Sequence, residues 1–215
     1  MFFRAAVGLL AGLVFSFAAA IAAERAVVAH GGNIFLNESN GQSRQLTSSG
    51  RDSAPRLSPD GKWVVFVRTL FGKKISTGSD EVDAAELWQI QANGKQPTLL
   101  VRPRESEKPE ELIAGFDNLQ FSTDGRLVYF VTSAWATSGA VHVVDTTKAK
   151  ERFVLPGNNL EVITIGKYRD CLLVQQHRYF LGAGSFDWFW LFRPDGTEVG
   201  PIGEETERFK ELYGK

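Results

Sequence analysis

A ten-residue unit that occurs twice limits what this chain can fold into. The segment at 58–67, SPDGKWVVFV, returns at 122–131 as STDGRLVYFV, with nine of the ten positions identical or similar. The Asp hydrogen-bonds its own turn and the Gly supplies a positive φ, so each copy predicts a tight turn. The strand that follows is apolar on both faces, and we expect it to be covered on both sides.

A second unit alternates with the first and predicts β-hairpins. Asn40-Gly41 and Asn93-Gly94 each separate two apolar runs, and Asn-Gly between such runs is a strong hairpin signal. Weaker copies of the two units lie at 141–155, 166–174 and 189–202. Two alternating hairpin types on a period near fifty residues give four strands per repeat, which is the blade of a β-propeller.

These spacings predict an all-β fold, a small β-propeller of about four four-stranded blades. Three blades are expected at 53–101, 117–155 and 160–202, and residues 26–47 supply an incomplete first blade without an inner strand. The tail 204–213 has helical residues, so we expect a short C-terminal helix that covers the edge left open by the incomplete blade. Burial of that edge in a homo-oligomer is the alternative.

The turn-and-strand unit resembles a known repeat. The run Ser-Pro-Asp-Gly-Lys-x-x-x-Phe at 58–66, preceded by 51–55, is similar to the TolB-type propeller repeat, itself similar to the WD-type repeat. The resemblance covers about 33–69 and 86–132, and it implies a propeller fold and a periplasmic compartment. The TolB family has an added amino-terminal α/β domain and six blades, and this sequence departs from that pattern in both respects, so the resemblance carries the family's envelope role only weakly.

The beginning of the chain has the pattern of an export signal. One positive charge at Arg4 precedes an uncharged run to Ala23, and Ala20-Ile21-Ala22 places small residues before a cleavage point. We therefore expect a signal peptide at 1–22, a propeller domain at 23–215, a periplasmic or secreted location and no membrane span after cleavage. An uncleaved anchor is the alternative. The single cysteine, Cys171, cannot form an internal disulfide.

Composition and motifs exclude several classes of function. The net charge of -1 and the pI near 6.3 provide no basic field for nucleic acid. No Gly-x-Ser-x-Gly elbow and no Walker or Rossmann glycine pattern occurs, and His30, His142 and His177 lack metal-ligand spacing. The sequence thus predicts a protein that is not an enzyme and has no cofactor, with calcium as the one ion to test.

The candidate binding residues precede the expected inner strands, whose ends surround the channel of a propeller. They are Arg51, Asp52, Asp117, Asn118, Asn158 and Asn159. We expect them to meet at the channel mouth, where carboxylate and amide oxygens suit calcium or the donors of a peptide. The alternative is structural, with Asp52 and Asp117 capping turns and aligning neighbouring blades.

Two other segments are candidates for contact with a partner. The segment 70–85 is expected to be a long irregular loop that docks a partner through Phe71, Lys73, Asp80, Glu81 and Asp83. The charged segment 102–115 is expected to be mobile surface. In the aromatic run 187–192, Trp188, Trp190 and Phe192 share one face, which is either a binding surface or buried between blades.

Two functional hypotheses follow. The first is a protein- or peptide-binding module of the cell envelope, with an envelope protein or peptide as its partner. The alternative is a small propeller hydrolase or lyase that acts on an envelope carbohydrate or peptide. It needs two carboxylates close together, and Asp52 with Asp117 is the pair that the sequence offers.

Overall fold

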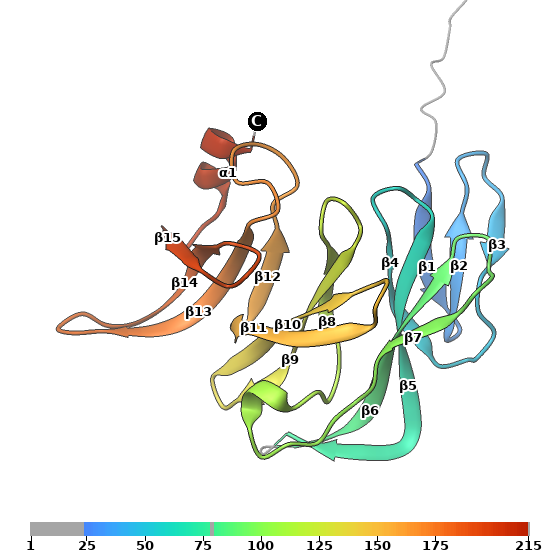
Figure 1. The fold of residues 1–215 in the computed structure, drawn as a ribbon, viewed down its shortest axis with the longest axis horizontal. Coiled ribbons are helices and arrows are strands. Elements are labelled where there is room, and N and C mark those ends of the chain that lie inside the picture. Colours follow the sequence, from blue (N-terminus) through green and yellow to red (C-terminus); the bar gives the residue numbers. More distant parts are fainter. Residues whose placement is uncertain (1–23, 78–79, 215) are drawn as a thin grey trace, which may run out of the picture.

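The computed structural model describes residues 24–77 and 80–214, and its regular structure is almost wholly antiparallel sheet. The predicted signal peptide lies outside the described residues. The four sheets follow one another along the chain, one with three strands and three with four, as Figure 1 shows. This confirms the predicted fold class, including the incomplete first blade.

The strand bounds agree with the predicted blades to within two residues. The first sheet contains β1 (Ala26–His30), β2 (Asn33–Asn37) and β3 (Ser43–Gln45). The second contains β4 (Asp52–Leu57), β5 (Trp63–Ser76), β6 (Glu81–Gln91) and β7 (Thr98–Val101). The third contains β8 (Asp117–Phe121), β9 (Leu127–Trp135), β10 (Ser138–Asp145) and β11 (Lys150–Pro156). The fourth contains β12 (Asn159–Val162), β13 (Leu172–Phe180), β14 (Gly184–Phe192) and β15 (Glu198–Gly203).

The repeated turn has the same hydrogen bonds in both copies. Ser58 Oγ donates to Asp60 Oδ1 at 2.7 Å and accepts from the Trp63 backbone N–H at 3.0 Å. Ser122 Oγ makes the matching bonds to Asp124 at 2.6 Å and from the Leu127 N–H at 3.0 Å. The glycine of each turn has a positive φ, 69° and 73°. The repeat is therefore a property of local geometry as well as of sequence.

The four sheets form an open arc in chain order (Figure 1). Buried side chains join the first sheet to the second, the second to the third and the third to the fourth. Inner strands are also linked, because Arg56 Nε donates to the Leu119 carbonyl at 3.1 Å and Asn118 Nδ2 donates to the Leu160 carbonyl at 2.6 Å. Among residues 24–77 and 80–214, no buried cluster joins the first sheet to the fourth.

The predicted C-terminal helix is present as α1 (Glu207–Tyr213). Its position differs from the expectation, because it lies against the fourth sheet, at the opposite end of the arc from the incomplete blade (Figure 1). Phe209 contacts the ring of Tyr168 with centroids 5.5 Å apart, in a cluster with Leu191 and Ile202. The apolar face of the last blade has no further blade to pack on, and α1 covers part of it. No helix in the described part of the chain is long and apolar enough to cross a membrane.

The segment 70–85 is not an irregular loop, so this expectation was wrong. β5 and β6 continue as a paired hairpin out to Ser76 and Glu81, and a register shift between Thr69 and Lys74 absorbs the additional residues. Gly72 lies in this irregularity with a φ of 79°. Lys74 and Asp83, which face each other across the strands, form an ion pair at 2.8 Å. Two charged residues of the predicted loop therefore pair across two strands.

The segment 102–115 is also more ordered than expected. It contains a short 3₁₀ helix, η1 (Pro109–Glu111), and an isolated bridge between Arg104 and Ile113. Leu112, Ile113 and Ala114 are buried. The apolar side chains at its end anchor the segment, which crosses between the second and third sheets beside the ends of β5 and β9.

Candidate functional site

One side of the arc gathers the features that define a propeller mouth. The inner strands β4, β8 and β12 begin there, and the hairpins β5–β6, β9–β10 and β13–β14 have their tips there. The repeated Ser-x-Asp-Gly turns lie on the opposite side, because each inner strand runs away from the mouth before it turns. All six mouth residues predicted from the sequence are thus on or next to the correct strand ends.

The register shows that Asp52 and Asp117 are not equivalent. Asp117 pairs with Val131, and the position that corresponds to it in the second sheet is Ser53, which pairs with Val67. Asp52 lies one residue earlier and pairs with Arg68. Successive side chains of a strand point to opposite faces, so this one-residue offset sends the two carboxylates in different directions. The expectation that equivalent positions bring them together is therefore wrong.

Asp52 is held in a buried ion pair. It is 1% exposed, and Arg68 approaches it with Nε 2.7 Å from Oδ1 and Nη2 3.0 Å from Oδ2. Burial alone would raise the pKa of Asp52, but hydrogen bonds from Arg68, Thr47 and Ser49 and the charge of Arg68 together lower that pKa below its ordinary value. Arg68 also stacks over Trp88, 4.9 Å from the ring centroid. Asp52 fits the structural alternative, since it ties the first strand of the blade to its neighbours.

The asparagines also link neighbouring blades. Asn118 Nδ2 donates to Asn159 Oδ1 at 2.8 Å, which joins β8 to β12. Asn158 accepts from the Gly139 N–H at 2.8 Å and donates to the Thr137 carbonyl at 2.9 Å, which fixes the β9–β10 hairpin. The structure does bring these residues together, with their side-chain amides used between blades. Arg51 is exposed beside Asp52.

A hollow of about 590 Å³ opens at the mouth between the β5–β6 and β9–β10 hairpins. Asp117 and Asn158, two of the predicted mouth residues, line it together with Asp80 from the predicted partner segment. Val82 and Val131 provide apolar lining, and Trp135 stands at its rim with 38% of its surface exposed. Residues of the predicted channel mouth and of the predicted partner segment thus line the same hollow.

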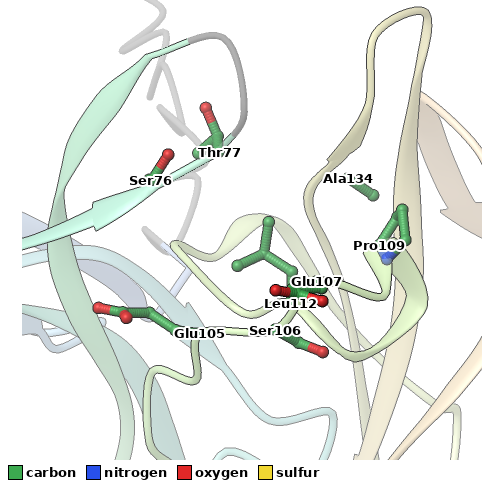
Figure 2. Close-up of a pocket in the computed structure, with 8 residues that line it drawn as sticks. All are labelled: Ser76, Thr77, Glu105, Ser106, Glu107, Pro109, Leu112 and Ala134. Atoms are coloured by element: carbon green, nitrogen blue, oxygen red, sulfur yellow. The ribbon is translucent and has the colours of Figure 1, made fainter.

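A second hollow of about 570 Å³ adjoins the first. Figure 2 shows Ser76 and Thr77 on one side of it and Pro109 and Ala134 on the other, with the 105–107 segment and Leu112 between them. Thr77 and Ala134 line both hollows, so the two are direct neighbours. We call the combined surface the mouth groove.

The charged side chains that line the mouth groove are all carboxylates. They are Asp80 and Asp117 in the first hollow and Glu105 and Glu107 in the second. Within the described residues, none of the four forms an ion pair, and no side-chain hydrogen bond links their carboxylates to another group. The lining contains no Lys, Arg or His in the part of the chain that the structure describes. Four unpaired negative charges around this surface favour a cationic ligand.

Several predicted residues lie outside the groove lining. Phe71 is 69% exposed on β5, Lys73 is exposed nearby, and Glu81 and Asp83 are on β6 without contributing to either hollow. Sequence reasoning also missed Glu105, Glu107 and Trp135. The position of Trp135 could have been predicted, because it ends β9 and the repeat places the tip of the β9–β10 hairpin on the mouth side. Glu105 and Glu107 belong to a connection that the other blades lack, so the repeat could not place them.

The sequence raised two further arrangements, a calcium site and a pair of carboxylates for hydrolysis. In residues 24–77 and 80–214, no group of three or more His, Cys, Asp or Glu side chains is placed to hold a metal ion. Asp52 is bound at two points by Arg68 and faces another direction than Asp117, which does not match a pair of carboxylates that meet at one substrate. His142 is fully buried and bound to Glu151, remote from both hollows.

The aromatic run on β14 divides between two environments. Trp190 and Phe192 are 6% and 3% exposed and pack in the cluster between the third and fourth sheets, as the burial alternative expects. Trp188 is only partly buried at the margin of that cluster. Cys171, placed at a core position by the repeat, is half-buried, and burial raises the pKa of its thiol.

No family model matches this chain, and no curated protein matches it. Several solved structures do match this chain. The β-propeller domain of the Trilobed protease from Pyrococcus furiosus is 17% identical, with 81% of this chain and 49% of that chain covered and a TM-score of 0.54. Porphyromonas gingivalis dipeptidyl peptidase 4 is 11% identical over 85% of this chain and 31% of that one, with a TM-score of 0.56.

A TolB candidate from Agrobacterium tumefaciens is 12% identical over 85% of this chain and 58% of that chain, with a TM-score of 0.53. The chain therefore spans between about a third and three fifths of these proteins. At such identities the likeness shows the fold, which is a TolB-like β-propeller.

Proposed function

We propose that this chain is a peptide- or protein-binding module of the cell envelope, and that its mouth groove binds an extended, positively charged segment of an envelope protein. The observation that carries the proposal is the lining of the groove, where every charged side chain is an unpaired carboxylate and apolar side chains such as Val82 and Leu112 lie among them. Lys and Arg side chains suit such a surface, because their heads pair with carboxylates while their stems pack on apolar atoms.

Two features of the fold support binding at this place. The groove lies between the paired strands of two hairpins and the 102–115 segment, which buried side chains anchor, so its walls are largely formed before binding. Trp135 stands at its rim as a large aromatic side chain, a type that is enriched at the centres of protein interfaces. The predicted signal peptide and the TolB-like fold support the envelope as the compartment.

The test is capture of a partner from the envelope of the host, with matched charge variants. The wild-type chain is cross-linked in the envelope and its captured proteins are identified, alongside Asp80→Asn/Asp117→Asn. The control is Glu204→Gln/Glu211→Gln, which removes the same charge from two exposed positions, one before α1 and one within it. We expect one protein that the wild type and the control capture and the groove variant loses.

Affinity for a defined probe makes the test quantitative. A synthetic peptide that alternates Lys with Val is titrated against the three proteins, with the same peptide carrying Glu in place of Lys as the comparison. Loss of two carboxylates should weaken binding of the Lys peptide about tenfold at low salt and much less at high salt. Equal binding of the Lys and Glu peptides, together with no protein captured through the groove, would refute the proposal.

A further inference from the structure

The hairpin β13–β14 ends in an uncharged tip that extends beyond the rest of the fourth sheet. Figure 1 shows this hairpin reaching away from the body of the molecule, past the other strands of its sheet. The two strands remain paired out to Phe180 and Gly184. Tyr179 is 79% exposed and Leu181 is fully exposed. We call residues 179–186 the arm tip.

The sequence of the arm tip, YFLGAGSF, contains no charged residue. The charges begin at its base, and they are paired there. Arg178 lies 2.7 Å from Glu198 and stacks on Trp190 with its guanidinium 3.6 Å from the ring centroid. His177 lies 2.9 Å from Asp187. The arm is therefore apolar at its tip, with a band of paired polar groups below it.

Contacts between aromatic rings support the arm along its length. Phe180 contacts Phe186 and Trp188 with centroid distances of 5.8 Å and 5.6 Å, and Phe186 contacts Trp188 at 5.2 Å. Phe180 and Trp188 pack against the cluster that joins the third and fourth sheets, and Phe186 contacts both of them from the tip. The tip is thus presented on a stiff support, so its exposed side chains lose little conformational freedom on binding.

We propose that the arm tip inserts into the interfacial layer of a phospholipid bilayer. Leu and Phe side chains gain from leaving water, and Tyr and Trp have an apolar body with a polar end that suits the headgroup level. The paired charges at the base would remain in the headgroup layer. Since the tip is neutral, insertion depends on apolar burial and should be insensitive to salt and to the charge of the lipid.

The size of the arm tip argues for a bilayer rather than a second copy of the chain. A stable protein interface uses roughly 20–30 residues on each side, whereas the arm tip has eight. A bilayer has no such requirement, because a few inserted side chains give reversible attachment. The tip belongs to the same side of the arc as the mouth groove, so insertion would turn that side toward the membrane.

The experiment uses the full chain with a label on the tip, so that attachment through any other segment does not interfere. Ala183→Cys is labelled with the fluorophore NBD in a Cys171→Ala background and mixed with vesicles of phosphatidylcholine or of phosphatidylethanolamine and phosphatidylglycerol. We expect a blue shift of the label with both vesicle types, and quenching by nitroxide-bearing lipids. Tyr179→Ser/Leu181→Ser should weaken this response about tenfold or more.

Ile165→Ser is the matched control, because Ile165 is 58% exposed in the turn at the other end of the last blade. Its response should equal that of the unaltered tip, and circular dichroism confirms that each variant is folded. A label that does not respond to vesicles overturns the proposal, as does a response that survives Tyr179→Ser/Leu181→Ser. A shift that rises with protein concentration in the absence of lipid would show protein docking instead, and would also overturn it.

Discussion

Asp52 and Arg68 form a two-point ion pair at the first rung of β4–β5, with the Asp52 side chain fully buried and that of Arg68 19% exposed. The pair joins the strand that starts the blade to the strand that fills its centre. Two parallel N–H···O bonds of a guanidinium to a carboxylate are among the stronger contacts available to side chains. The stability of the second blade therefore depends on both members.

Removal of Asp52 should be costly. Asp52→Ala leaves a largely buried guanidinium without its partner, and we expect a loss of about 3 kcal/mol in the free energy of unfolding. Urea unfolding followed by circular dichroism measures the loss. Asp117→Ala is the comparison, because Asp117 is exposed and is expected to change stability by no more than about 0.5 kcal/mol. Equal losses in the two variants would contradict the different roles assigned to the two carboxylates.

The turns of the repeat provide a second prediction. Asp60 and Asp124 each accept a serine hydroxyl and a backbone N–H, and these bonds lower the pKa of both carboxyls. Asp60→Ala and Asp124→Ala should each cost about 1 kcal/mol. The turns share no hydrogen-bond partner, but Gly125 lies close to Pro59, so the two turns are neighbours. A loss in the double variant equal to the sum of the two would show that the turns act independently.

The corresponding asparagine variants test the mechanism of the turn. Asn retains an oxygen that accepts the same hydrogen bonds, so Asp60→Asn and Asp124→Asn should preserve most of the stability. Denaturation midpoints of the four single variants and the double alanine variant decide this. If asparagine is as harmful as alanine, the charge rather than the hydrogen-bond geometry is what the turn requires.

The fold could be predicted from the sequence further than the site could. The turn-and-strand repeat and the two Asn-Gly hairpins depend on local chemistry, so the blade bounds followed from spacing alone. The difference between Asp52 and Asp117 was also present in the spacing, because Asp52 lies eight residues before Asp60 and Asp117 lies seven before Asp124. What the sequence did not show is the bulge that both inner strands share, where Ala54 and Asn118 have φ values of 47° and 50°. One residue of offset moved Asp52 from the expected mouth to the interior of the blade.

The mouth groove needed the three-dimensional structure for a different reason. Its lining comes from three connections far apart in the chain, and the one that contributes Glu105 has no counterpart in the other blades. The segment 70–85 was predicted to be a loop because its charges are typical of a loop. In the structure its residues pair across two strands, Lys74 with Asp83 and Ile75 with Val82. Cross-strand pairing, which sequence spacing does not reveal, decided between the two.

Acid should weaken the third blade through Glu151. Burial alone would raise the pKa of Glu151, but the hydrogen bond and charge of His142 and those of Arg104 lower that pKa below its ordinary value. A carboxyl with a lowered pKa in the folded state stabilises the fold above its unfolded pKa, near 4.5. That contribution is lost as the pH falls through the lower folded pKa.

Glu151→Gln isolates this effect from the other carboxyls. At pH 7 the variant should be about 2 kcal/mol less stable than the wild type, because His142 and Arg104 lose a charged partner. The difference should shrink as the pH is lowered from 5 to 3. Urea midpoints of both proteins across this range provide the measurement, and a difference that stays constant would show that Glu151 does not ionise differently in the folded state.

Alkali should weaken the core between the third and fourth sheets through Tyr129. This side chain is 1% exposed, and burial raises its pKa to about 12 from an ordinary value of 10.0. The folded state therefore retains a proton that the unfolded state releases, so stability is complete below pH 10 and declines as the pH rises toward 12. A shift of this size corresponds to about 2–3 kcal/mol over that window.

Tyr129→Phe should remove this decline, because it has no phenolic proton to lose. Thermal unfolding between pH 9 and 11.5 compares it with the wild type and with Tyr179→Phe, in which an exposed phenol is removed. Lysines also titrate in this range, but they do so equally in all three proteins, so the difference between the curves reports Tyr129 alone. A parallel decline in Tyr129→Phe and the wild type would mean that this phenol reaches water before the fold opens, and that the two sheets pack less tightly around it than its burial implies.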